Sequence, residues 1–118
     1  MSNTIETIAD LHWAFDVADA FDSVPPVHPG DILRVEFMEP FDLSAGAVAR
    51  AIGLPRSRIK RIVKREIGIS TDTALRLARL FRTSHQFWLN LQSQFESATL
   101  LPRIGDELAR ITPMPEAA

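Results

Sequence analysis

The sequence predicts an all-α fold, a compact five-helix domain with an acidic helical arm at the N-terminus. Three observations support this prediction. Apolar residues recur at spacings of three and four along most of the chain, residues with capping side chains precede several of these stretches, and no stretch is convincing as a strand. With 118 residues and no cysteine, the chain is long enough for one small domain with tails and cannot form disulfides.

Charge is distributed unevenly along the chain, although the net charge is only −2. Residues 1–42 hold nine acidic residues and the single base Arg34, a balance of −8. Residues 43–82 hold ten bases against Glu66 and Asp72, a balance of +8. A basic middle with an acidic arm favours one polyanionic partner and one basic partner.

The arm, residues 1–26, comprises an amphipathic stretch and a proline-rich joint. From Thr4 to Phe21 the apolar residues at helical spacing are Ile5, Ile8, Leu11, Phe15, Ala18 and Phe21. This helix could pack on its own domain or dock on a partner, and both interpretations stay open. Residues 23–29 contain three prolines, which prevent a continuous helix there.

The first two helices of the domain, which we place at residues 27–100, follow this joint. Pro29 suits a helix start, and an apolar stripe predicts a helix over Gly30 to Glu39 that Pro40 ends. The stripe consists of Ile32, Leu33, Phe37 and Met38. Ser44 can cap a second helix, which is rich in small residues and ends at Gly53.

Three further helices complete the domain. The third begins near Pro55 or Arg56, and Ser70 caps the fourth. We expect the fourth to turn these residues inward: Ala74, Leu75, Leu77, Ala78 and Phe81. Thr83 with Gln86 predicts a capping box for the fifth helix, in which Phe87 and Trp88 serve the core or a dimer interface rather than base stacking. Residues 101–118 are expected to be a weakly ordered tail, with a possible short helix at 104–111.

The third helix carries the residues that favour a function. Its stripe of Ile59, Ile62 and Val63 faces a core, and the opposite side holds Arg56, Ser57, Lys60, Arg61 and Lys64. Such a face can simply be solvated. However, a basic helix that follows a capped helix and a tight turn is the helix-turn-helix arrangement. In this arrangement arginine side chains can read guanine in the major groove, and flanking lysine and arginine side chains neutralise phosphates.

Several motifs resemble one family over roughly residues 27–95. They are His28-Pro29-Gly30-Asp31-Ile32-Leu33, Ala49 to Leu54, Ile69-Ser70, Ala74 to Ala78, and Phe87-Trp88-Leu89-Asn90-Leu91-Gln92. The sequence is similar here to the HigA antitoxins, or VapI group, of XRE-type (lambda-repressor-like) helix-turn-helix regulators. The resemblance implies a homodimer that binds double-stranded operator DNA, represses its own operon and neutralises a RelE/HigB-like toxin that cleaves messenger RNA. A solitary XRE-type regulator without a toxin is the alternative.

The resemblance also implies roles for individual residues. The base-reading positions are Arg56, Ser57, Lys60 and Arg61. The phosphate-contacting positions are Ser44, Arg58, Lys64 and Arg65. Ala45 replaces a glutamine that is frequent in the family, Pro55 replaces the usual Ser or Thr cap, and Arg65 occupies a loop position that is often glycine.

The acidic arm has two possible roles besides packing on the core. It could wrap a basic toxin by charge complementarity and apolar burial through Ile8, Phe15, Asp16, Asp19 and Phe21. It could instead fold onto the basic helix of its own chain and weaken DNA binding until a partner removes it. Deleting it distinguishes the two, since toxin neutralisation fails under the first and DNA affinity rises under the second.

Other chemistry is not indicated. The three histidines lack metal-ligand spacing, so we expect no metal and no cofactor. No nucleophile elbow, phosphate loop or paired acid and base is present, and we therefore expect no enzymatic activity. No apolar run reaches membrane-spanning length, and a cytoplasmic location is the expectation.

Overall fold

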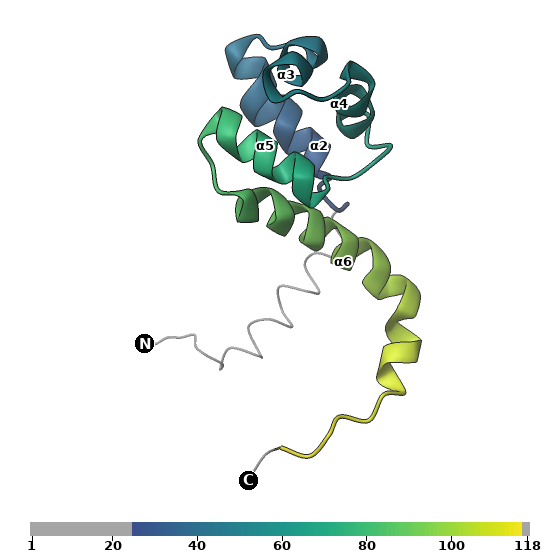
Figure 1. Cartoon of the computed structure of the whole chain (residues 1–118). Coiled ribbons are helices and arrows are strands. Elements are labelled where there is room, and N and C mark those ends of the chain that lie inside the picture. Colours follow the sequence, from purple (N-terminus) through teal and green to yellow (C-terminus); the bar gives the residue numbers. More distant parts are fainter. Residues whose placement is uncertain (1–24, 117–118) are drawn as a thin grey trace.

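The computed structural model describes residues 25–116 as an all-helical chain without strands, which confirms the predicted fold class (Figure 1). Its elements are α2 (Pro29–Ile32), η1 (Leu33–Met38), η2 (Glu39–Phe41), α3 (Ala45–Ile52), α4 (Arg56–Val63), α5 (Thr71–Phe81) and α6 (His85–Ala109). The elements α2, η1 and η2 follow one another without a break, so the described residues form five helical segments, as expected.

The first segment changes its winding along its length. It begins as an α-helix, widens to a π-helix over Leu33–Met38 and tightens to a 3₁₀ turn over Glu39–Phe41. The expectation that Pro40 stops the helix after Glu39 was wrong, because the helical segment continues two residues further, to Phe41. Pro40 lies in the first turn of the 3₁₀ segment, where its missing N–H group is not needed, and the chain turns at Asp42 with φ 53°.

The His-Pro-Gly motif joins α2 to the rest of the domain. The Nδ1 atom of buried His28 accepts a hydrogen bond of 2.9 Å from the Gly30 N–H and so caps the helix. The ring of His28 lies edge-on to Phe95 of α6, with 4.7 Å between centroids. At Gly30 a Cβ atom would lie 1.9 Å from the carbonyl oxygen of Ile62, so only glycine permits this approach of α2 to α4.

The core is built from all five segments around Trp88. Its largest fully buried side chains are Trp88, Leu33, Ile59, Ile62, Leu77 and Val48. The Phe37 ring contacts Trp88, with centroids 5.0 Å apart, and the indole N–H donates a 2.8 Å hydrogen bond to Thr83 Oγ1. The prediction that Trp88 serves packing rather than base stacking is therefore confirmed. Leu75, expected inside, is 51% exposed.

The start and the length of α6 also differ from expectation. Ser84 caps the helix through a 3.0 Å hydrogen bond from the Phe87 N–H, whereas Thr83 Oγ1 is occupied by the Trp88 indole, so the predicted capping box was wrong. The helix then runs for 25 residues through Pro102 and crosses the expected boundary at residue 100. Because Ala98 is exposed, water can bond the carbonyl group that Pro102 leaves without a donor.

Candidate nucleic-acid interface

The helix-turn-helix unit consists of α3, a turn and α4. Ser44 Oγ accepts a 3.0 Å hydrogen bond from the Ala47 N–H and caps α3, as predicted. Gly53 ends α3 in the left-handed region, with φ 75°, where glycine is favoured. Pro55 is the residue before α4, and it contributes no side-chain cap. Local sequence thus determines the sharp turn between the two helices.

A side chain of helix α5, which lies outside the helix-turn-helix unit, forms hydrogen bonds to this turn. Arg76 donates through Nη1 to the carbonyl oxygens of Ile52, at 2.6 Å, and Gly53, at 3.4 Å. Its Nε atom pairs with the carboxylate of Asp72 one turn earlier. A guanidinium group therefore bonds carbonyls at the C-terminal end of α3, which carries partial negative charge. Sequence reasoning missed this contact because its partners are 23 and 24 residues apart.

Gly46 of α3 lies near the side chain of Arg56, the first residue of α4. Gly46 is buried in α3, and a Cβ atom there would lie 3.6 Å from Cδ of Arg56. The aliphatic part of Arg56 thus lies close to the backbone of α3. The Arg56 residue as a whole remains exposed.

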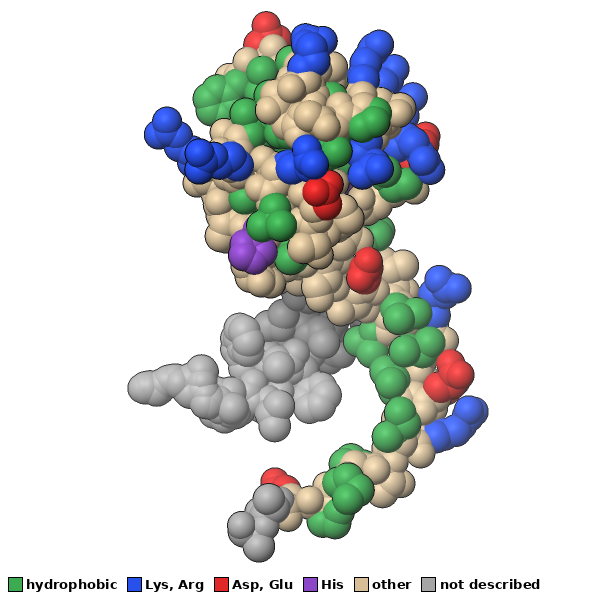
Figure 2. Space-filling model, in the orientation of Figure 1, with side chains coloured by type: hydrophobic (Ala, Val, Ile, Leu, Met, Phe, Trp, Pro, Cys, Tyr) green, Lys and Arg blue, Asp and Glu red, His purple; other side chains and the backbone are tan. Residues whose placement is uncertain are grey.

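Helix α4 divides into a buried and an accessible side. Ile59 and Ile62 are fully buried, and Val63 is half-buried. The exposed residues among the candidate contacts are Ser44, Arg56, Ser57, Arg61, Lys64 and Arg65, while Arg58 and Lys60 are half-buried. Figure 2 shows Lys and Arg side chains gathered at the end of the domain that holds α3 and α4. The structure thus brings the sequence-predicted basic residues together on one end of the domain.

Two of these basic residues have acidic neighbours. Arg65 forms a double contact with Asp31 of α2, through Nε–Oδ1 at 3.0 Å and Nη2–Oδ2 at 2.8 Å. Arg61 Nε lies 3.4 Å from Glu66 Oε1. Arg65 also has φ 65°, which explains why a glycine would suit this position. Any DNA contact by these arginines must compete with, or be shared with, the two carboxylates.

Other predicted features lie elsewhere. The candidate toxin-binding residues Ile8, Phe15, Asp16, Asp19 and Phe21 fall outside the described residues. Within residues 25–116, no group of three or more His, Asp or Glu side chains could hold a metal ion. None of the helices in that range combines the length and apolar composition that a membrane span requires.

The class of protein follows from this geometry together with comparisons. A capped, small-residue helix, a tight turn and a basic second helix define a helix-turn-helix domain, and the helix-turn-helix family model matches residues 36–88. Virulence-associated protein I of Dichelobacter nodosus is 48% identical over 73 residues, which cover 62% of this chain and 68% of that protein. Antitoxin HigA-1 of Vibrio cholerae is 28% identical over 75% of this chain and 84% of its own length.

Solved structures agree with this class. The Pseudomonas aeruginosa antitoxin HigA, solved with the higBA promoter, has a TM-score of 0.72 and 45% identity, covering 76% of this chain and 99% of that one. The antitoxin GraA in complex with its operator has a TM-score of 0.72 and 39% identity, covering 77% and 93%. The chain belongs to the HigA/VapI family of XRE-type helix-turn-helix antitoxins and regulators, whose matched members are not enzymes.

Proposed function

We propose that this chain binds operator DNA as a homodimer through α4, represses its own operon and neutralises a RelE/HigB-like toxin that cleaves messenger RNA. The observation that carries the proposal is the construction of α4. Two fully buried isoleucines fix the helix to the core, and its basic residues are left at the surface beside a capped α3. Two solved relatives with this fold, 45% and 39% identical, are described as bound to promoter or operator DNA.

The proposal assigns base reading to exposed and half-buried positions of α4. These are Arg56, Ser57, Lys60 and Arg61. Arginine suits guanine because its fork matches the O6 and N7 acceptors in the major groove. Two α4 helices in a dimer would then enter major grooves about 34 Å apart.

Phosphate contacts are assigned to the margins of this face. They comprise Ser44, Arg58, Lys64 and Arg65. Of these, Lys64 lies at the C-terminal end of α4 and is exposed. Arg65 is paired with Asp31, so its contribution requires either sharing or release of that carboxylate. Such contacts set affinity and salt dependence rather than sequence preference.

Two variants test the DNA-binding part of the proposal. On an operator selected from random DNA, Arg61→Ala should weaken binding by about 1–3 kcal/mol and relax the base preference. Lys64→Ala should weaken all sequences alike and lower the slope of log K against log salt concentration by about one unit. Fluorescence anisotropy over a range of salt concentrations measures both effects. Wild-type affinity in both variants would contradict the assignment of α4.

Toxin neutralisation is assigned to the acidic arm. Residues 1–24 carry five acidic residues and no Lys or Arg, and RNA-cleaving toxins need positive surfaces. Substituting Phe15→Glu together with Phe21→Glu should abolish rescue of cell growth when the toxin is co-expressed, because the apolar contact is lost. DNA affinity should not change. If instead operator affinity rises, the arm acts on its own basic helix.

A solitary regulator remains the second candidate. It is favoured by relatives that carry only the description of an HTH-type transcriptional regulator, such as YbaQ of Escherichia coli, 34% identical over 77% of this chain. The neighbouring reading frame distinguishes the two candidates. A small basic toxin that co-purifies with this chain supports the first, whereas operator binding without any such toxin supports the second.

A further inference from the structure

A shallow groove lies between the C-terminal end of α3 and the outer side of α5. It has a volume of about 720 Å³, and its lining includes Ala51, Leu75, Arg76, Arg79, Leu80 and Arg82. Leu75 is 51% exposed there, and Leu80 is half-buried. None of the lining residues is among the candidate DNA contacts, so the groove is a separate surface from the basic face of α4.

The groove is basic, and part of its charge is not used within the domain. Its three arginines and one aspartate, Asp72, give it a charge of +2. Arg76 pairs with Asp72 and bonds the end of α3. Arg79 and Arg82 are exposed and form no ion pair within residues 25–116, where Asp72 is already paired. Two guanidinium groups are therefore available to an acidic ligand beside an exposed leucine.

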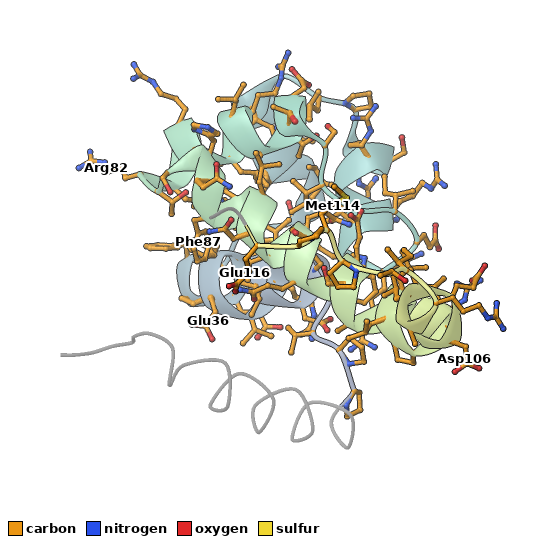
Figure 3. All side chains as sticks on the ribbon, turned by 90° about the horizontal axis from the view of Figure 1, so that it is seen from below. Glu36, Arg82, Phe87, Asp106, Met114 and Glu116 are labelled. Atoms are coloured by element: carbon orange, nitrogen blue, oxygen red, sulfur yellow. The ribbon has the colours of Figure 1, made fainter. Side chains whose placement is uncertain are left out.

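Arg82 occupies a position at which the backbone favours glycine. It follows the last residue of α5 with φ 60°, in the left-handed region where a side chain is strained. Gly53 occupies the equivalent position after α3. In Figure 3 the Arg82 side chain extends outward from the end of α5. Because no ion pair within residues 25–116 accounts for an arginine here, we interpret its charge as part of a binding surface.

The acidic arm of this chain has the chemistry that fits such a groove. An apolar side chain flanked by arginines is complementary to a segment that combines apolar residues with carboxylates. Residues 1–24 hold five acidic residues and no Lys or Arg. At helical periodicity, Asp19 and Asp22 fall on the same predicted face as Ile8 and Phe15. The sequence of the arm thus places carboxylates beside apolar side chains.

Helix α4 is a poorer match for the arm, although it is also basic. Large apolar side chains that the described residues leave exposed include Leu75 of the groove, and none of them lies on α4. In addition, Arg61 and Arg65 already have Glu66 and Asp31 as acidic neighbours. The apolar face of the arm would therefore gain contacts in the groove that α4 does not offer.

The arm is long enough to reach the groove from the point where the described chain begins, at Pro25. A helix from Thr4 to Phe21 would be about 27 Å long, at 1.5 Å per residue. Residues 22–28 in extended form add up to about 20 Å. The described residues measure 33 Å and 28 Å along their two shorter axes. A tether of this length can bring the arm to α5 of the same chain.

We propose that the acidic arm, residues 1–24, docks in the groove between α3 and α5 of its own chain. Its carboxylates pair with Arg79 and Arg82, and its apolar residues lie against Leu75 and Leu80. Docking leaves α4 open to the operator, because the groove shares no residue with the candidate DNA contacts. One consequence rests on the proposed function: a toxin that binds the arm must first take it out of the groove.

Methyl NMR of the full chain with a nitroxide on the arm tests the proposal. The chain has no cysteine, so Ala14→Cys places a single label beside the apolar residues of the arm. The methyl signals of Leu75 and Leu80 should be lost while the nitroxide is oxidised and should return when it is reduced. The signals of Leu108, on the part of α6 that extends beyond the domain, should persist. Persistent signals of Leu75 and Leu80 would overturn the proposal.

A charge-matched pair of variants isolates the contribution of the arginines. Arg79→Gln with Arg82→Gly removes both free charges, and the fold should be kept because glycine suits φ 60°. The groove signals should then persist with the nitroxide oxidised. Arg103→Gln with Arg110→Gly removes two charges from α6 instead, and the groove signals should still be lost. Equal behaviour of the two variants would contradict the groove as the docking site.

Two further results would assign a different occupant or a different site. Nitroxide-labelled chain without isotope is mixed with isotope-labelled chain without nitroxide, and the groove signals should persist; their loss would show the arm of a second copy and overturn the proposal. Loss of the Val63 signal on α4, with the groove signals intact, would also overturn it. These measurements use neither DNA nor toxin, so their failure is distinguishable from a failure of the proposed function.

Discussion

At the scale of single residues, hydrogen bonds between near neighbours could be predicted from the sequence, and contacts between distant ones could not. Ser44 and Ser70 cap α3 and α5 as expected, because a cap needs only a Ser or Thr just before an apolar periodicity. The Arg65 contact with Asp31 spans 34 positions and follows from folding alone. Thr83 resembled a helix cap, but its hydroxyl oxygen accepts a hydrogen bond from the Trp88 indole N–H instead.

His28 makes the stability of the domain dependent on pH. Burial lowers the pKa of His28 from 6.5; Asp31 acts in the opposite direction, and Arg65 lowers the pKa further. The unfolded chain therefore binds more protons than the folded one as pH falls through 6.5, so stability is full above this pH and decreases below it. Protonation would also remove the acceptor that Nδ1 offers to the Gly30 N–H.

His28→Asn tests this dependence. Asparagine can accept the same backbone hydrogen bond but does not titrate, so the variant should lose less stability than the wild type between pH 7.5 and pH 5. It should be less stable overall, because the contact with Phe95 is lost. Urea unfolding at both pH values measures the difference. An equal loss in both proteins would show that other groups cause the dependence.

Arg65→Gly separates two roles of one side chain. Glycine relieves the cost of φ 65°, which offsets the loss of an ion pair whose Arg65 side chain is 64% exposed and whose Asp31 side chain is 20% exposed, so stability should change by about 1 kcal/mol or less. If Arg65 contacts phosphate, the variant should lower the salt slope of operator binding by about one unit. An unchanged salt slope would show that Arg65 pairs with Asp31 and does not contact phosphate.

At the scale of elements, the sequence predicted which segments are helical better than it predicted how they are wound and where they end. The apolar spacing of the first segment was read correctly as helical, but periodicity does not reveal that residues 33–38 adopt a π-helix. Residues 101–118 were expected to form a weakly ordered tail with a short helix at 104–111, whereas α6 continues without a break through Pro102 to Ala109. Tertiary surroundings decide such boundaries.

Gly30 and Gly105 offer a matched pair of substitutions in helical segments. Gly30→Ala should destabilise the domain by more than about 2 kcal/mol, because its Cβ atom would clash with the Ile62 carbonyl and force α2 away from α4. Gly105→Ala meets no neighbour and should stabilise the helix by about 0.5–1 kcal/mol. Chemical denaturation of both variants gives the comparison. A similar effect of the two substitutions would contradict the close approach of α2 to α4.

At the scale of the whole molecule, the sequence predicted an all-helical domain with a basic helix-turn-helix unit, and the structure confirms that architecture. The charge distribution was visible in the sequence, since the ten bases of residues 43–82 stand out against an acidic arm. The half-buried state of Arg58 and Lys60 could not be predicted from the sequence. Periodicity gives the direction of a side chain around its helix, but it does not show how far neighbouring elements cover that side chain. The exposed leucines near the end of α6 were not anticipated, because an unbroken helix through Pro102 was not expected.

Hydroxyl-radical footprinting on an operator selected from random DNA tests the central claim most directly, which is that α4 of two copies reads one operator. The wild-type chain should protect two segments on one face of the duplex, with centres about one helical turn apart. Arg61→Ala should lose this pattern at concentrations where the wild type gives full protection. A single protected segment, or the same footprint from both proteins, would contradict the claim.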